Sequence, residues 1–371
     1  MKVVTVVGAR PQFIKAAAVT RALPGFNQGM GRRPIREVLI HTGQHYDEDM
    51  SAVFFRELGI PAPAYHLDVG SGPHGQQTGR MLERLEPLLA RERPDWVLVY
   101  GDTNSTLAGA LAASKLGLPI AHVEAGLRSH NRVMPEESNR VVTDHLSSLL
   151  FCPTERSVKN LHGEGILKGV HLVGDVMHDS LLYHLDQADR GGEVLAMLGL
   201  RAGAYALATV HRAEITDRPE ALNALFEALG AIGLSVVVPL HPRSKVVLQR
   251  NGMPRLSDSI RLIPPVSYHE MLMLERHARL VLTDSGGVQK EAFWLHVPCV
   301  TLRDETEWVE TLDEGWNRLA GTQPERIVAA VRAALEGGPR ASSALPGDGR
   351  AAERILDMLV RSGDPVPVFR N

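Results

Sequence analysis

Short apolar runs alternate with helical patterns along the first half of the chain. The helical patterns cover, for example, residues 75–92 and 107–117. A parallel strand is buried on both faces, so continuous apolar runs joined by helices predict a doubly wound parallel sheet in an α/β fold. We expect the strands of this sheet at residues 2–8, 36–42, 95–101, 118–124 and 147–152.

The same alternation starts again in the second half of the chain. Between the two halves, residues 169–180 end a strand and turn into a helix, which places a hinge near 173–178. We therefore expect two Rossmann-like domains, at 1–174 and 175–350, with ligand in a cleft at the carboxyl ends of their strands. The second set of strands is expected at 204–210, 234–240, 259–265, 278–284 and 297–302.

Composition and charge narrow the class of protein. The chain has 371 residues, 44% hydrophobic and 22% charged, which is typical of a globular protein of two domains. A net charge of −3 gives no electrostatic reason to expect nucleic acid or an anionic membrane. We expect a soluble cytoplasmic protein, because signal-peptide and membrane-spanning patterns are missing and Cys152 and Cys299 lie in apolar segments typical of buried free thiols.

The turn GARPQFIKAA (8–17) follows the first strand directly. Arg10 and Lys15 lie near the positive end of the helix that begins there, which favours an anion. The glycine pattern of dinucleotide sites, GxGxxG, is absent. The turn is therefore either a phosphate clamp or a surface turn with solvated cations.

The turn TDSGGVQKEA (283–292) repeats this geometry in the second half. Ser285, Gly286 and Gly287 offer backbone N–H groups and a hydroxyl to a phosphate, and Glu291 lies one turn further on, where a ribose diol would bind. The alternative is an ordinary helix start capped by Asp284 or Ser285. Two successive glycines exceed what a cap requires and favour the ligand.

Two histidines follow apolar strands at equivalent positions. His211 lies in TVHRAE, and His241 lies in PLHPR with Arg243 two residues later. A single histidine is more often structural, but two at strand ends favour a functional role.

Carboxylates follow two strands of the first half. Asp102 comes directly after one strand and Glu124 after the next, so we expect them to converge at one edge of the sheet. The alternative for Asp102 is a helix N-cap. Glu136 and Glu137 suit the first turn of a helix, and one of the two is expected only to stabilise that helix.

These residues indicate a diphosphate held by cations and helix N-termini, with carboxylates beside it. Patterns typical of metal sites, such as HExxH and CxxC, are absent, so we expect no metal. A nucleotide diphosphate sugar fits this arrangement, with the carboxylates transferring protons at carbon or at a hydroxyl.

Eight segments together resemble the non-hydrolysing UDP-N-acetylglucosamine 2-epimerase family. They are GARPQFIK, HTGQHYD, GDTNSTLAGALAASK, HVEAGLRS, PEESNR, TVHRAE, PLHPR and DSGGVQKEA. The resemblance implies two Rossmann-like domains of the GT-B type, with the last helix, at about 351–371, crossing back to the first domain.

The resemblance also implies a reaction without a redox cofactor or a required metal. UDP leaves UDP-N-acetylglucosamine to give bound 2-acetamidoglucal and adds back as a proton returns to the opposite face of C2, giving UDP-N-acetylmannosamine. The implied catalytic residues are Asp102, Glu124, Glu136 and His211. The residues implied to hold UDP are Arg10, Lys15, Arg140, Ser285, Gly286, Gly287 and Glu291.

The sequence departs from the common family pattern in places that concern the substrate. GARPQFIK stands where many members have GTRPEAIK, and RDETEWVE stands for RxxTERPE, which puts Trp308 at the arginine position. Both variants resemble the branch that epimerises UDP-2,3-diacetamido-2,3-dideoxyglucuronic acid, so both substrates stay open. Some members carry a second, activating UDP-sugar site; HTGQHYD retains Gln44 but has Asp47 where they have glutamine, which argues against such activation.

Two other classes share this fold. A retaining glycosyltransferase would need an acceptor, and the trio of Asp102, Glu124 and Glu136 would have no clear purpose in it. A nucleotide-sugar sensor would bind without turnover. We expect a homodimer whose substrate is a UDP-sugar, with His241, Arg243 and Gln44 as sugar-contacting or regulatory residues.

Overall fold

Two parallel sheets, one in each half of the chain, organise the protein into two α/β units. A computed structural model describes residues 1–29, 33–44, 55, 57–188, 193–216, 218–240, 256–313, 315–337 and 347–362. The first unit comprises Met1–Ser180 with Pro346–Asn371, and the second comprises Leu181–Leu345. The division therefore falls after Ser180, inside a helix, where the sequence analysis placed it after residue 174.

The first unit contains a seven-stranded sheet in the order β3-β2-β1-β4-β5-β6-β7. All its neighbouring strands pair in parallel, and the order reverses between β1 and β4, as in a doubly wound fold. The strands are β1 (Lys2–Val7), β2 (Arg36–His41), β3 (Tyr65–His66), β4 (Trp96–Tyr100), β5 (Ile120–Val123), β6 (Leu149–Cys152) and β7 (Val170–Leu172).

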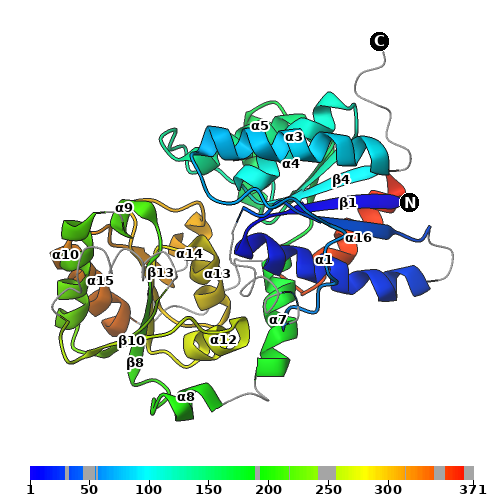
Figure 1. Cartoon of the computed structure of the whole chain (residues 1–371). Helices are drawn as coiled ribbons and strands as arrows, with labels where there is room; N and C mark the ends of the chain where they lie inside the picture. Colours follow the sequence, from blue (N-terminus) through cyan, green and yellow to red (C-terminus); the bar gives the residue numbers. More distant parts are fainter. Residues whose placement is uncertain are drawn as a thin grey trace. The chain divides into compact units, whose positions relative to one another are not determined.

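Helices cover both faces of this sheet (Figure 1). Val4 and Val6 of β1 pack with Met81 and Leu85 on one face, while Phe13 is buried on the helix that contacts β1 from the other. Alternate strand residues thus enter opposite layers of the core. The helices of the unit are α1 (Arg10–Gln28), α3 (His74–Glu92), α4 (Asn104–Lys115), α5 (Pro135–Leu146), α6 (Glu155–Gly163), α7 (Val176–Ala188), which continues past the division, and α16 (Ala351–Arg361).

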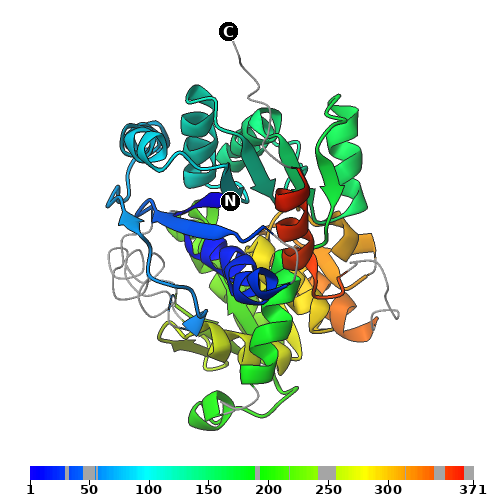
Figure 2. The same cartoon turned by 90° about the vertical axis from the view of Figure 1, so that its right-hand side faces the viewer.

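The last described helix returns to the first unit. Figure 2 shows α16, in red, beside α1, in blue, and the two helices are in contact. Ile355 and Leu359 of α16 are completely buried, and the backbone N–H of Ala352 donates to Asp179 Oδ2 at 2.8 Å. Apolar burial and this cap hold α16 in place.

The second unit contains a six-stranded parallel sheet in the order β10-β9-β8-β11-β12-β13. Its order reverses between β8 and β11, so both units have the expected doubly wound, Rossmann-like topology. The strands are β8 (Tyr205–Thr209), β9 (Ser235–Pro239), β10 (Ile260–Ile263), β11 (Leu280–Thr283), β12 (Cys299–Thr301) and β13 (Asn317–Leu319).

Two apolar layers enclose this second sheet. Ala206 and Ala208 of β8 pack with the residues of α10 and α15, while Tyr205 and Leu207 pack on the opposite face with those of α12 and α13 (Figure 1). The helices are α8 (Glu193–Met197), α9 (Ala213–Thr216), α10 (Pro219–Ala231), α12 (Tyr268–Arg276), α13 (Gly286–Trp294), α14 (Val309–Asp313) and α15 (Pro324–Glu336). No helix in the described part of the chain is long and apolar enough to cross a membrane.

The two cysteines are buried free thiols, as expected. Burial raises the pKa of the Cys152 thiol to about 12, and burial raises that of Cys299 further. Both are therefore neutral core residues and poor nucleophiles.

Gly126 occupies a turn that only glycine fits. Its φ is +80°, and a Cβ at this position would lie 2.3 Å from the carbonyl oxygen of Ser157. The N–H of Gly126 donates to Asp144 Oδ2 at 3.1 Å, so the turn cannot move away without losing this bond. The close approach brings the loop after β5 against α6.

We predict that Gly126→Ala lowers the free energy of unfolding by about 1–3 kcal/mol, because the methyl group overpacks the turn and the left-handed conformation is strained. Urea unfolding measures the change. Gly79→Ala is the matched control: Gly79 lies in α3 with no atom within 4 Å of the added Cβ, so this variant should be unchanged or slightly more stable. Equal stability of the two variants would contradict the account of the turn.

Candidate active site

The turn after β1 is tied to the turn after β4 by one buried glutamine. Gln12 Oε1 accepts from the backbone N–H groups of Gly8 and Ala9 at 2.8 and 3.1 Å. The Gln12 amide donates to the carbonyl oxygen of Tyr100 and to Thr106 Oγ1, both at 3.0 Å. Gln12 had no role in the sequence predictions, although a glutamine at the third position of a helix is a known capping signal.

Lys15 and Glu124 form a buried ion pair at the ends of two strands. The Lys15 ammonium contacts Glu124 Oε2, and the two residues are only 7% exposed each. Gly101, after β4, leaves room for the pair: a Cβ there would lie 2.9 Å from Lys15 Nζ and 3.2 Å from Glu124 Oε2. Lys15, expected to hold UDP, thus contacts an expected catalytic group.

Glu124 has an unusual backbone conformation. Its φ is +72°, in the left-handed region that side chains other than glycine rarely adopt. The backbone N–H groups of Glu124 and Ala125 both donate to the carbonyl oxygen of Phe151, at 3.0 and 3.1 Å. Strain held in place by such bonds is typical of functional sites and fixes the direction of the Glu124 side chain.

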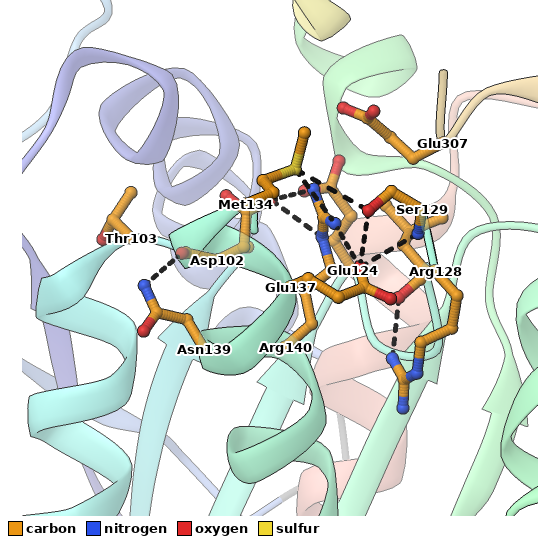
Figure 3. A network of polar contacts seen from close by, with 12 residues as sticks. Asp102, Thr103, Glu124, Arg128, Ser129, Met134, Glu137, Asn139, Arg140 and Glu307 are labelled. Carbon is orange, nitrogen blue, oxygen red and sulfur yellow. Dashed lines mark hydrogen bonds and ion pairs between the residues drawn. The ribbon is translucent and has the colours of Figure 1, made fainter. Parts of the chain in front are cut away.

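Asp102 is oriented by a buried arginine (Figure 3). Arg140, which is 2% exposed, places Nε 3.0 Å and Nη2 2.7 Å from Asp102 Oδ2. The N-cap of α4 is Thr103, whose hydroxyl accepts from the N–H of Thr106, so the alternative of Asp102 as a helix cap is wrong. The Asp102 side chain is 27% exposed and can reach a ligand.

Glu136 and Glu137 have different surroundings. Glu137 accepts from the N–H groups of Ser129 and His130, both at 2.9 Å, and from Arg140 Nη1 at 2.7 Å (Figure 3). Burial alone would raise the pKa of Glu137, but these hydrogen bonds outweigh it and lower the pKa. Glu137 therefore fixes the loop before α5. Glu136 lies in the first turn of α5 and is partly exposed.

In the second unit, a buried aspartate orients His211. Asp284 Oδ2 accepts from the backbone N–H groups of His211 and Arg212 at 2.9 and 2.8 Å, and His211 Nδ1 lies 3.0 Å from Asp284 Oδ1. Burial would raise the pKa of Asp284, but His211 and the two N–H groups together lower it. From the sequence, Asp284 was expected only as a possible cap. Because β8 and β11 are neighbouring parallel strands, the positions of His211 and Asp284 just after them could have indicated that the two residues meet.

The start of α13 retains the features expected of a phosphate site. Ser285 is the N-cap, and its side chain makes no capping bond. A Cβ on Gly286 would lie 2.8 Å from Glu307 Oε1 and 3.1 Å from Trp308 Nε1, so the glycine lets these two side chains approach the start of the helix. Glu291, 4% exposed, accepts from the Tyr268 hydroxyl at 2.9 Å, which fixes its carboxylate.

The remaining predicted site residues lie in different surroundings, and two of them lie outside the described part of the chain. Gln44 Oε1 accepts from the N–H and the hydroxyl of Ser105 at 3.1 and 2.7 Å, so it binds the start of α4. Arg10 is the first residue of α1 and is half-buried. His241 and Arg243 lie outside the described residues.

Comparisons with known proteins confirm the resemblance. A family model described as UDP-N-acetylglucosamine 2-epimerase matches residues 29–360. A UDP-N-acetylglucosamine 2-epimerase homolog of Methanococcus maripaludis is 53% identical over 88% of this chain and 91% of its own. The UDP-2,3-diacetamido-2,3-dideoxy-D-glucuronate 2-epimerase of Pseudomonas aeruginosa is 48% identical over 97% of this chain and 100% of its own.

A solved structure agrees with these relatives. The crystal structure of Methanocaldococcus jannaschii UDP-GlcNAc 2-epimerase in complex with UDP-GlcNAc and UDP has a TM-score of 0.89 and 44% identity, covering 97% of this chain and all of the other. The likeness extends over both α/β units, and the family model spans most of the sequence. The chain belongs to the UDP-N-acetylglucosamine 2-epimerase family.

Proposed function

We propose that this protein inverts C2 of a UDP-N-acetylhexosamine, converting UDP-N-acetylglucosamine to UDP-N-acetylmannosamine. The observation that carries the proposal is the pair of carboxylates at neighbouring strand ends, each held by a buried cation: Glu124 by Lys15 and Asp102 by Arg140. The complex of UDP-GlcNAc and UDP with the related Methanocaldococcus jannaschii enzyme supports a UDP-sugar as the substrate.

The proposed reaction breaks two bonds and then restores them. A carboxylate takes the proton from C2 while the bond between C1 and the UDP oxygen breaks, which leaves bound 2-acetamidoglucal and UDP. The UDP oxygen then adds to C1 as a carboxylic acid returns a proton to the opposite face of C2. Two faces require more than one acid–base group, and we assign this role to Asp102, Glu124 and Glu136.

Departure of UDP requires stabilisation of the charge that develops on the diphosphate. We propose that Arg10 and the N–H groups at the start of α13, at Ser285, Gly286 and Gly287, supply it, with Glu291 on the ribose. We propose that His211, whose Nδ1 lies beside Asp284, supports the leaving phosphate through its other ring nitrogen. Lys15 and Arg140 were predicted to hold UDP; we propose that they also position Glu124 and Asp102, with which they pair.

A second substrate has a specific observation in its favour. The relative from Pseudomonas aeruginosa is named for UDP-2,3-diacetamido-2,3-dideoxy-D-glucuronate, and it matches nearly the whole chain. Trp308, at the position that resembles this branch, is 3% exposed and lies over Lys290, whose Nζ is 3.8 Å from the ring centroid. We propose the diacetamido uronic acid as the alternative substrate of the same reaction. A cytoplasmic location and a homodimer stay predictions.

Proton NMR of the purified protein with UDP-N-acetylglucosamine in D2O tests the proposal. We expect signals of UDP-N-acetylmannosamine with deuterium at C2, because the proton removed exchanges with solvent before another returns. The same experiment with the diacetamido uronic acid distinguishes the two substrates. Unchanged spectra with both sugars, from a protein that binds UDP, would contradict the proposed reaction.

Asp102→Asn should stop turnover, and calorimetry should show that this variant still binds UDP.

We further predict that Asp284→Asn lowers kcat by about 100-fold, because asparagine keeps the size of the side chain but removes the charge that holds His211. The pKa of Asp284 is lowered in the folded state, so its stabilisation is complete above about pH 4 and is lost as the pH falls through the folded value. The stability difference between wild type and variant should therefore shrink below about pH 4 in urea unfolding.

Asp304→Asn is the control for this variant. The Asp304 side chain is 75% exposed and pairs with Arg326 at the surface, where an ion pair contributes little. Its kcat and stability should match those of the wild type. An Asp284→Asn enzyme with the same kcat as Asp304→Asn would show that the contact between Asp284 and His211 is not used in turnover.

A further inference from the structure

His122 lies in the middle of β5 with no access to water. The residue is 0% exposed, and each ring nitrogen faces one acceptor. Its Nε2 lies 2.7 Å from the carbonyl oxygen of Gly101, and its Nδ1 lies 2.7 Å from Asp144 Oδ1. The catalytic roles proposed above do not use either His122 or Asp144.

The hydrogen bonds determine where the protons lie. A carbonyl oxygen only accepts, so His122 Nε2 carries a proton and donates it to Gly101. The other oxygen of Asp144 accepts from the N–H of Gly126 at 3.1 Å and from Arg128 Nη1 at 2.7 Å. A carboxylate with these donors is ionised, and it therefore also accepts a proton from His122 Nδ1. Both ring nitrogens are donors, which makes His122 an imidazolium.

The charges around His122 agree with this state. Arg128 also binds Glu164, with Nε 2.6 Å from Oε1 and Nη2 2.8 Å from Oε2. Asp144 therefore lies between His122 and Arg128, and Arg128 shares its charge with Glu164, a partly exposed carboxylate that also lies 3.4 Å from His145 Nε2. Burial would raise the pKa of Asp144, but His122 and Arg128 outweigh it and lower the pKa. The nearby Cys152 thiol is uncharged, since burial raises its pKa to about 12.

The cluster joins the two loops that carry the proposed acid–base groups. Gly101, bound by His122, directly precedes Asp102. Gly126 and Arg128, bound by Asp144, closely follow Glu124. One buried imidazolium–carboxylate pair therefore connects the backbone on both sides of the site, without reaching the site itself.

We infer that His122 is a positioning residue: as a buried imidazolium paired with Asp144, it holds the turns of Asp102 and Glu124 at a fixed separation. This role rests on the proposed function for its effect on turnover. The charge of His122 does not depend on the proposed function, because it follows from hydrogen bonds within the protein alone. An error of about 1 Å in the placement of catalytic groups lowers the rate by up to about 100-fold.

Nitrogen-15 NMR of ring-labelled histidines tests the charge in the protein without substrate. His122→Gln assigns the signals by their absence. We expect both ring nitrogens of His122 to resonate in the protonated range at neutral pH, because each of them faces an acceptor. One nitrogen in the unprotonated range would show a neutral ring and overturn the inference.

Asp144→Asn tests the positioning role. An asparagine keeps the size of the side chain and an acceptor for Arg128, but its amide donates to His122 Nδ1 and leaves the ring neutral. We expect kcat to fall by about 10- to 100-fold, KM to stay within about twofold, and one His122 nitrogen to move to the unprotonated range. A neutral ring with unchanged kcat would overturn the positioning role.

Two further variants complete this experiment. His162→Gln changes an exposed histidine of α6 and should leave kcat unchanged. If Asp144→Asn does not fold, His122→Gln supplies the kinetic test, with the same expected fall in kcat at nearly constant KM. A wild-type protein without epimerase activity would refute the proposed function, while the ring-nitrogen signals would still decide the charge of His122.

Discussion

The ion pair between Lys15 and Glu124 is the contact on which the site of the first unit depends. It connects the helix after β1 to the end of β5 across the turn after β4, and that turn leaves room only because residue 101 is a glycine. A charge this deeply buried is stable only with its partner, so the pair fixes three strand ends at once. The left-handed backbone of Glu124 is part of the same arrangement.

Three further aspartates are fixed in a similar way, by partners from other elements. Asp102 is held by Arg140, Asp144 by Arg128 and Asp284 by the backbone N–H groups of His211 and Arg212, and each partner comes from a different element from the acid. The carboxylates are therefore oriented by the fold itself. Groups fixed before the reaction stabilise a transition state without the cost of reorganising during it, which suits the loss of a proton from unactivated carbon.

Much of this arrangement could be predicted from the sequence, and the rest depends on contacts between distant segments. The long apolar strands, α3, α16 and the positions of Asp102, Glu124 and His211 follow from periodicity and from the rule that parallel strands end together. Strands β3 and β13 were missed because runs as short as Tyr65–His66 and Asn317–Leu319 carry no period. The division after Ser180 lies inside α7, where composition does not change.

The residues that sequence reasoning missed share one property. Gln12, His122, Asp144 and Asp284 all act through partners on other strands and helices, so their roles depend on the register between elements. A buried polar residue within an apolar strand, such as His122, was the signal available. It indicates an unusual environment but does not name the partner.

The proposed reaction requires that the bond between C1 and the UDP oxygen breaks and forms again at a site prepared by these ion pairs. UDP-N-acetylglucosamine, or the diacetamido uronic acid if that is the substrate, with oxygen-18 in the bridge between C1 and the β-phosphorus tests it most directly. Phosphorus-31 NMR follows the label. The account predicts that the label spreads to the non-bridging β-oxygens of recovered substrate and product. A C2 epimer that keeps all of its label in the bridge would contradict it.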